Sequence, residues 1–243
     1  MSLLLNYKWL CPLILCLIVF AIKCKGQTEA RYENEFWPTF NATFEVAPRS
    51  RVNFTAQKRD GEDAYYQQNI VGAVFSYRTA RIANRLRGDI DKENEYNLVI
   101  GGGYQYIRTK QTSGVKDEQR VLVQFTPKYI IGPAILVQDR SQMEFRWIDG
   151  HYNFRYRNKV IIDRPFKLNK FRLSPYASGE LFWDRNHHAW DENQYAFGIQ
   201  VPFKKVLLLD TYYLRQNCTT CSLNPLNVLG VTVSLFSNWP YKR

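Results

Sequence analysis

Polar and apolar residues alternate along much of this chain, and the alternation is clearest between residues 118 and 159. A period of two is the signature of a β-strand, because successive side chains point to opposite faces of the sheet. One face of this stretch carries Arg, Glu and Gln, whereas the other carries Val, Phe, Tyr and Trp. The pattern predicts three consecutive strands, each with one charged face and one apolar or aromatic face.

The same alternation recurs on both sides of this stretch and gives eleven strand-like runs in total. The clear runs are long enough to span a membrane, for which a strand needs roughly 9–11 residues. Single-chain bacterial barrels usually have an even number of strands. We therefore expect about 10–12 strands, with twelve favoured and the missed strand sought within residues 81–95.

The chemistry of the two faces favours a membrane barrel over a soluble sheet. In outer-membrane barrels the apolar rows face lipid, aromatic residues mark the interfaces and the polar rows face the lumen. The lumen of a small barrel is filled by side chains. We predict an all-β fold, an antiparallel up-and-down transmembrane β-barrel of the outer-membrane type. The expected lumen-lining residues are Glu118, Arg120, Arg140, Glu144, Arg146, Arg155, Arg157, Arg172 and Glu180.

Residues 1–26 have the pattern of a signal peptide. Lys8 precedes an apolar run from Leu10 to Ile22, and cleavage is expected after Gly26. Residues 27–243 then form a single β-barrel domain, exported to the outer membrane of a Gram-negative bacterium. Lipidation at Cys24 and an uncleaved N-terminal anchor are the alternatives.

The chain is basic, with 33 Lys and Arg against 22 Asp and Glu. Nucleic acid is not the expected partner, because the predicted export argues against it and the basic residues are spread over alternate strand positions. Outer-membrane lipid, lipopolysaccharide phosphates and the barrel-assembly machinery are the expected partners. The glycines Gly101–Gly103 lack the Lys-Ser/Thr pair of a phosphate-binding loop. They are better explained as a bulge, a bend or space for a bulky neighbour, and no cofactor is expected.

Two cysteines, Cys218 and Cys221, lie outside the predicted signal peptide, in the sequence Cys-Thr-Thr-Cys. In an exported protein this spacing predicts a local disulfide. A zinc site completed by His187 and His188, or a redox-active pair, are the alternatives. We expect no metal site.

Several strand segments have recognisable sequences, namely Phe36-Trp-Pro38, Glu118-Gln-Arg-Val-Leu-Val-Gln124, Arg140-x3-Glu144-x-Arg146, Phe154-Arg-Tyr-Arg157, Glu180-Leu-Phe-Trp183 and the strand that begins at Gln194 and ends at Lys204-Lys205. Together they resemble the domain-of-unknown-function 2490 family of exported bacterial proteins, and the resemblance covers nearly all of the mature chain. The resemblance implies an outer-membrane-type barrel with no assigned activity.

The predicted function is a structural barrel or a narrow solute pore that favours anions. The alternative is a soluble secreted protein, either lipocalin-like or a β-sandwich, that binds a ligand with its aromatic rows inside. A phospholipase-like hydrolase is less favoured, because it needs a His-Ser pair at the outer surface. A glycosidase pair of Glu144 and Glu180 is disfavoured because flanking arginines keep both carboxylates ionised. We expect no catalytic residues.

Overall fold

The computed structural model describes residues 33–61, 66–79, 91–132, 134–168, 171–203, 206–220 and 225–237. The described chain is nearly all β-structure, with one short 3₁₀ helix, η2 (Lys92–Glu95). The predicted signal peptide (residues 1–26) and Cys221 lie outside the described residues. Among the described residues, no helix has the length and hydropathy needed to cross a membrane.

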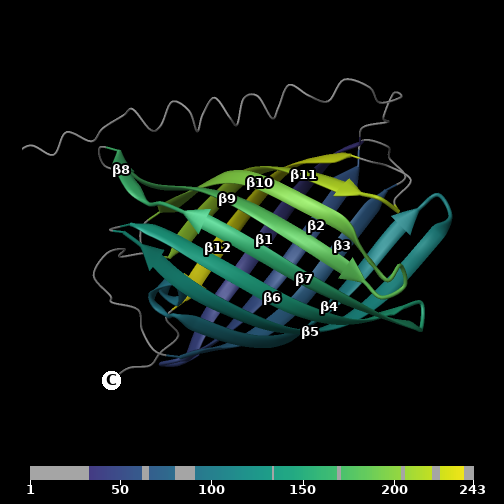
Figure 1. The fold of residues 1–243 in the computed structure, drawn as a ribbon, viewed down its shortest axis with the longest axis horizontal. Coiled ribbons are helices and arrows are strands. Elements are labelled where there is room, and N and C mark those ends of the chain that lie inside the picture. The colour runs from purple at the N-terminus through teal and green to yellow at the C-terminus, as the bar shows by residue number, and fades with distance from the viewer. Residues whose placement is uncertain are drawn as a thin grey trace, which may run out of the picture. The chain divides into compact units, whose positions relative to one another are not determined.

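Eleven strands form a closed ring, in which each strand pairs with its neighbours in chain order (Figure 1). A short extra strand, β8 (Phe166–Leu168), pairs only with the start of β9, outside the ring. The ring strands are β1 (Glu33–Ala47), β2 (Ser50–Gly61), β3 (Gln67–Arg78), β4 (Leu98–Gln111), β5 (Gly114–Ile131), β6 (Ile135–Ile148), β7 (His151–Asp163), β9 (Phe171–Asp184), β10 (Ala189–Phe203), β11 (Leu207–Cys218) and β12 (Leu226–Ser237).

The predicted barrel is confirmed, and each of the eleven runs in the sequence corresponds to a ring strand. The preference for twelve strands is wrong. Between β3 and β4 the described residues 91–97 hold η2 and a single bridge residue, and residues 80–90 lie outside the description. With an odd number of alternating strands the first and last strands run in the same direction. The ring therefore closes through a parallel pairing of β1 with β12, from Glu33 opposite Leu226 to Phe44 opposite Ser237.

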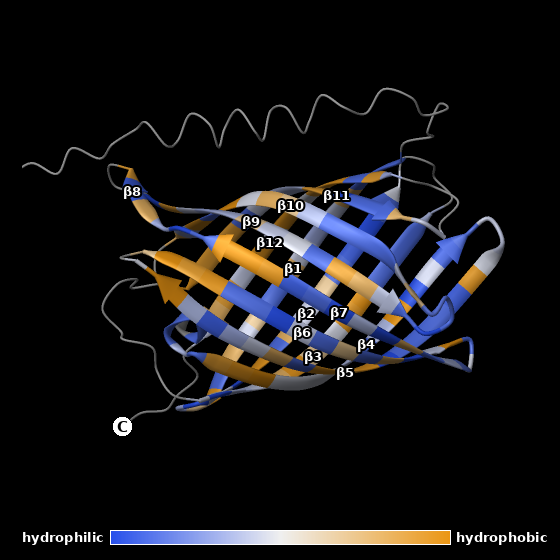
Figure 2. Ribbon diagram, viewed as in Figure 1, coloured by the Kyte–Doolittle hydropathy of each residue, from blue (hydrophilic) through white to orange (hydrophobic). Residues whose placement is uncertain are grey.

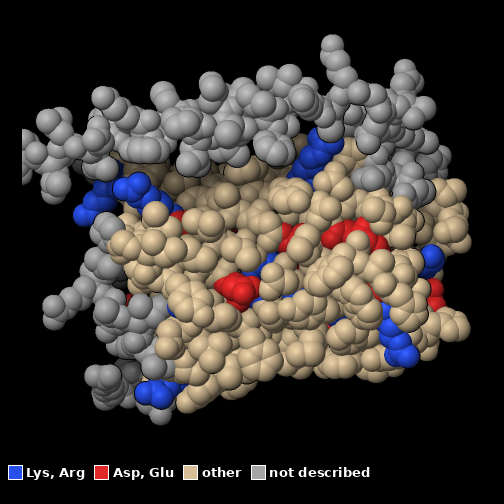
Figure 3. Space-filling model, viewed as in Figure 1, with Lys and Arg blue, Asp and Glu red and all other residues tan. Residues whose placement is uncertain are grey.

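The barrel buries charged side chains and exposes apolar ones. Glu144 is 0% exposed, whereas Phe197 is 66% exposed, and every ring strand carries at least one exposed large hydrophobic residue. Hydrophobic and hydrophilic residues alternate along the strands (Figure 2), and much of the visible wall shows no charged atoms (Figure 3). The lipocalin-like and sandwich alternatives required the aromatic rows inside, so this arrangement contradicts both.

Glycines let bulky side chains lie flat across neighbouring strands inside the barrel. Gly230 faces Tyr212 on β11, and a Cβ atom added to Gly230 would lie 2.0 Å from the Tyr212 ring. In β4, a Cβ atom on Gly101 would lie 2.8 Å from the Gln124 amide. The pairing of β4 with β3 and β5 runs without a register shift. The glycine run therefore makes space for neighbours and forms no bulge.

Gly230→Ala is expected to destabilise the barrel by about 1–3 kcal/mol, because the new methyl group overlaps the Tyr212 ring in a packed interior. Chemical unfolding, followed by tryptophan fluorescence, measures the change. Gly179→Ala is the matched control, since a Cβ atom there would meet its nearest neighbour, Tyr195, at an ordinary 3.8 Å. Equal stability of the two variants would contradict the packing role of Gly230.

Candidate functional site

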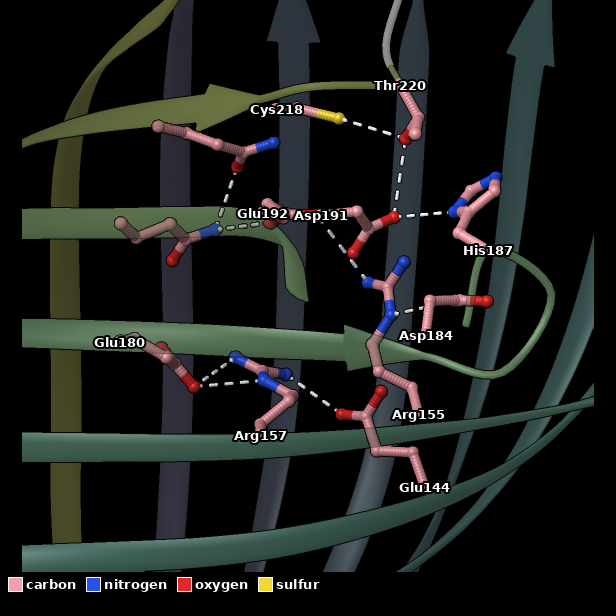
Figure 4. A network of polar contacts seen from close by, with 12 residues as sticks. Glu144, Arg155, Arg157, Glu180, Asp184, His187, Asp191, Glu192, Cys218 and Thr220 are labelled. Atoms are coloured by element: carbon pink, nitrogen blue, oxygen red, sulfur yellow. Dashed lines mark hydrogen bonds and ion pairs between the residues drawn. The ribbon is translucent and has the colours of Figure 1, made fainter. Parts of the chain in front are cut away.

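The barrel interior holds a network of ion pairs that includes Glu144 of β6, and Figure 4 shows the part that joins Glu144 through Arg157 to Glu180. The Oε1 atom of Glu144 accepts hydrogen bonds from Arg120 at 3.2 Å, Arg157 at 2.9 Å and Gln142 at 2.7 Å. These donors lie on β5, β7 and β6, so one carboxylate links three strands. Burial of an ionised carboxylate is tolerated only when such partners replace its hydration.

A second buried carboxylate, Glu180 of β9, extends the network around the ring. Its Oε1 atom lies 2.8 Å from Arg157 and 3.1 Å from Arg140, and its Oε2 atom lies 3.7 Å from Lys159. Arg157 thereby bridges Glu144 and Glu180. Bridging arginines with several charge-assisted hydrogen bonds hold their planes in fixed orientations.

A third group of ion pairs lies toward the end of the barrel where β5 begins. Arg146 contacts Glu118 at 2.6 Å and Asp184 at 3.5 Å. Arg120 also contacts Glu118, at 2.8 Å, which joins this group to Glu144. Arg155 lies 3.4 Å from Asp184 and 3.8 Å from Glu192. Charges from β5, β6, β7, β9 and β10 therefore form one continuous interior network.

The structure places eight of the nine residues predicted to line the lumen in this network. The exception is Arg172, whose backbone lies opposite Lys167 in the antiparallel pairing of β9 with β8. The ring pairings of β9 run only from Ser174 to Asp184. Arg172 follows the same alternation as Glu180 but lies beyond the ring, on the short β8–β9 hairpin that projects from it in Figure 1.

A cavity of about 340 Å³ lies inside the barrel, lined from ten of the eleven ring strands. Three acidic residues line it, namely Glu180, Glu192 and Asp210. Six basic residues also line it: Arg59, Arg120, Arg140, Arg155, Arg157 and Lys159. Other carboxylates of the network, including Glu144 and Glu118, lie in the wall behind these cations, so the surface of the cavity is richer in positive charge than the network as a whole.

Arg59 of β2 is a cavity residue that the sequence analysis missed. Its guanidinium carbon lies 3.9 Å from the centre of the Trp37 ring on the adjacent strand β1, and its Nε donates to Gln57 at 3.0 Å. Trp37 is 4% exposed and donates its indole N–H to Glu35. The alternation of β2 places Arg59 inside, but its pairing with a tryptophan depends on the neighbouring strand.

At the other end of the barrel, buried cations hold the η2 segment. Arg51 contacts Asp91 at 2.7 Å and also contacts Glu93, while Lys128 donates to the carbonyl oxygen of Glu93 at 3.2 Å. Burial acts to raise the pKa of Asp91, but the Arg51 and Lys128 charges outweigh it and lower the pKa below its ordinary value. The segment before β4 is therefore fixed to β2 and β5 by charge.

Near the β9–β10 turn, His187 Nδ1 lies 2.6 Å from Asp191, which also accepts from Thr220 at 3.3 Å. Cys218 is disulfide-bonded, and its predicted partner Cys221 lies outside the described residues. Among the described residues, no cluster of three or more His, Cys, Asp and Glu is arranged to hold a metal ion. In the same residues, Asp191 is the hydrogen-bond partner of His187, and no serine hydroxyl contacts its ring.

These features define a closed β-barrel protein with a charged interior. The chain belongs to the family described as Protein of unknown function (DUF2490), which matches residues 34–223, so the predicted membership is confirmed. A similar solved structure is described as a bacterial polysaccharide outer membrane secretin, with 9% sequence identity and a TM-score of 0.46. That match covers 76% of this chain and 63% of the other, so this chain spans less than two thirds of its length. No curated protein matches the sequence.

Proposed function

We propose that this protein is a transmembrane β-barrel of the bacterial outer membrane, with a narrow polar lumen that favours small anions. The observation that carries the proposal is the inverted burial, with ionised side chains inside and large apolar side chains outside on every ring strand. In water such an apolar wall would promote aggregation, whereas in a lipid bilayer it contacts apolar acyl chains. Lipid and lipopolysaccharide contact the wall, and the barrel-assembly machinery inserts it.

The strand lengths support this assignment. The shortest ring strands, such as β3, have 12 residues; at about 3.3 Å per residue and a tilt of about 40°, such a strand covers roughly 30 Å. This height exceeds the roughly 25 Å apolar band of an outer-membrane barrel. Each ring strand can therefore cross the apolar layer and still present ends to water.

A polar patch on β6 and β7 interrupts the apolar wall, and its side chains hydrogen-bond to one another. Asp139 alternates with the cavity residue Arg140 and so points outward. It accepts a hydrogen bond from Asn158 at 2.7 Å, and Ser141 lies 3.0 Å from the Tyr156 hydroxyl. Mutual hydrogen bonds reduce the cost of facing lipid.

Cell fractionation followed by gels of unboiled and boiled samples tests the proposal. An outer-membrane barrel is expected in the membrane fraction and is expected to migrate differently before and after boiling, because the closed fold resists detergent until heated. A monomer that stays soluble without detergent and shows no mobility change would overturn the membrane assignment.

In planar bilayers, the wild-type barrel is expected to show a small conductance with a preference for chloride over potassium. Arg157→Ala is expected to raise the conductance and weaken the preference, because the variant removes a cation and opens space beside the cavity. Arg108→Ala is the control, since Arg108 is 52% exposed and pairs with Asp117 away from the cavity. If neither the wild type nor Arg157→Ala conducted, the transport part of the proposal would fail and a structural barrel would remain.

A further inference from the structure

Among the arginines that line the cavity, Arg59 is the one to which the described residues bring no carboxylate within 4 Å. Arg120, Arg155 and Arg157 each lie within 4 Å of two carboxylates. Within the described parts of the chain, by contrast, Arg59 makes no ion pair, and Gln57 is its hydrogen-bond partner. In the described residues no hydrogen bond occupies its terminal N–H groups, so these groups can bind a ligand.

The stacking on Trp37 fixes how Arg59 presents those groups. The guanidinium lies over the indole face, an arrangement favoured by the ring quadrupole and strengthened where water is excluded. Trp37 is itself buried and held by Glu35. A guanidinium stacked by its face keeps its edge available, and the edge is the part that binds carboxylate or phosphate with two parallel hydrogen bonds.

The surroundings of Arg59 favour a negatively charged occupant. Tyr66 and the Glu35 carboxylate attract Arg59, and Glu35 forms no ion pair with it among the described residues, whereas the charges of Arg157 and Arg120 repel it across the cavity. A bound anion would relieve this repulsion. The nearby acid Glu192 lines the same cavity but contacts Arg155, at 3.8 Å.

The rest of the lining suits a polar solute. Three glutamines line the cavity from β2, β3 and β4, namely Gln57, Gln68 and Gln105. Tyr176 of β9 and Tyr212 of β11 line it as well. Amide and hydroxyl groups donate to and accept from uncharged polar groups. A cavity of about 340 Å³ lies at the small end of the range for small-molecule sites.

We propose that the cavity binds the carboxylate or phosphate group of a small polar solute, and that Arg59, oriented by Trp37, contacts the anionic group directly. The inference deepens the anion-favouring lumen and rests on that proposed function for the route by which the solute arrives. Binding itself can be measured on the purified barrel in detergent, without a membrane.

Isothermal titration calorimetry of the mature chain with inorganic phosphate, glucuronate and glucose tests the inference. We expect phosphate or glucuronate to bind with one site per chain and glucose to bind far more weakly. Arg59→Gln is expected to weaken anion binding by about tenfold or more, since a charge-assisted bidentate contact is lost. Arg59→Lys keeps the charge but not the planar guanidinium, so its affinity for the anion is expected to lie between those of the wild type and Arg59→Gln.

The titrations with phosphate and with glucuronate distinguish two kinds of anionic ligand. Binding of phosphate without glucuronate supports a free phosphate ion as the ligand, and binding of glucuronate without phosphate supports an acidic solute. Absence of binding by both to the wild type would overturn the site, as would glucose binding as tightly as glucuronate. The exposed-arginine variant Arg108→Gln must retain binding, and an equal loss there would reduce the effect to general surface charge. Absent conductance with intact binding would count against the pore and leave this site standing.

Discussion

Glu144→Leu is expected to destabilise the barrel by about 3–5 kcal/mol, the cost of removing one partner from a buried ion-pair network. Glu144 is completely buried, and the side chains of Arg120 and Arg157 converge on its Oε1 atom. Leucine is similar in size to glutamate, so little packing is lost. The loss in stability therefore measures the two cations that remain without this counter-charge.

Guanidinium chloride unfolding in detergent, read by tryptophan fluorescence and by gel mobility without boiling, measures the effect. Asp117→Leu is the matched control, because Asp117 is 50% exposed and lies 3.8 Å from an equally exposed Arg108. An exposed pair of this kind contributes less than about 1 kcal/mol. Equal midpoints for the two variants would show that the interior charges are hydrated and that the network does not stabilise the barrel.

Combining Glu144→Leu with Arg157→Met separates the loss of the pair from the burial of a cation that has lost one of its two counter-charges. When Arg157 is replaced, Glu180 still has contacts from Arg140 and Lys159. If the cation with one counter-charge fewer causes most of the loss, the double variant is expected to be more stable than Glu144→Leu alone, because an apolar pair can replace a buried ion pair at little cost. Strictly additive losses would contradict a direct interaction between the two side chains.

The two faces of the barrel could be predicted because a strand's alternation is a local property. Whether Arg120 and Val121 point in opposite directions depends only on the backbone between them. Because one face is charged and the other is apolar and aromatic, the second is the face predicted to contact lipid. For this reason the interior positions of Arg146, Arg157 and Glu180 followed from the sequence alone.

Where a strand enters or leaves the ring is not local. Arg172 has the alternation of an inward-facing residue, but its backbone lies opposite Lys167 of β8, because β9 extends beyond the pairings that close the barrel. Arg59 was missed for a related reason. Its position in β2 predicts an inward side chain, but its role depends on Trp37 from β1 and on cations from strands far along the chain.

The number of strands depends on closure, which no single run encodes. The sequence contains eleven runs, and the expectation of an even number came from other barrels. The parallel pairing of β1 with β12 needs no twelfth strand, since its backbone hydrogen bonds satisfy both edges. The described part of the interruption expected to hide a strand holds η2, which is fixed by Arg51 and Lys128.

The odd strand number predicts that the two ends of the barrel chain lie on opposite sides of the membrane. Ser237 pairs with Phe44 near the end of β1, whereas Asn34 lies at its beginning. In an even-numbered up-and-down barrel both ends would lie on one side. Asn34→Cys and Ser237→Cys are therefore expected to react with a membrane-impermeant maleimide from different sides, so that only one of the two is labelled in intact cells.

Two exposed turn residues provide the controls. Thr112 lies in the β4–β5 turn at the Asn34 end, and Arg49 lies in the β1–β2 turn at the Ser237 end. Thr112→Cys must therefore label with Asn34→Cys, and Arg49→Cys with Ser237→Cys. Labelling of Thr112→Cys and Arg49→Cys from opposite sides, together with labelling of Asn34→Cys and Ser237→Cys from the same side, would require an even number of strands, and the parallel closure would then be wrong. Labelling of all four variants in intact cells would instead mean that the chain does not cross the membrane, because an impermeant reagent reaches both ends only when no bilayer separates them.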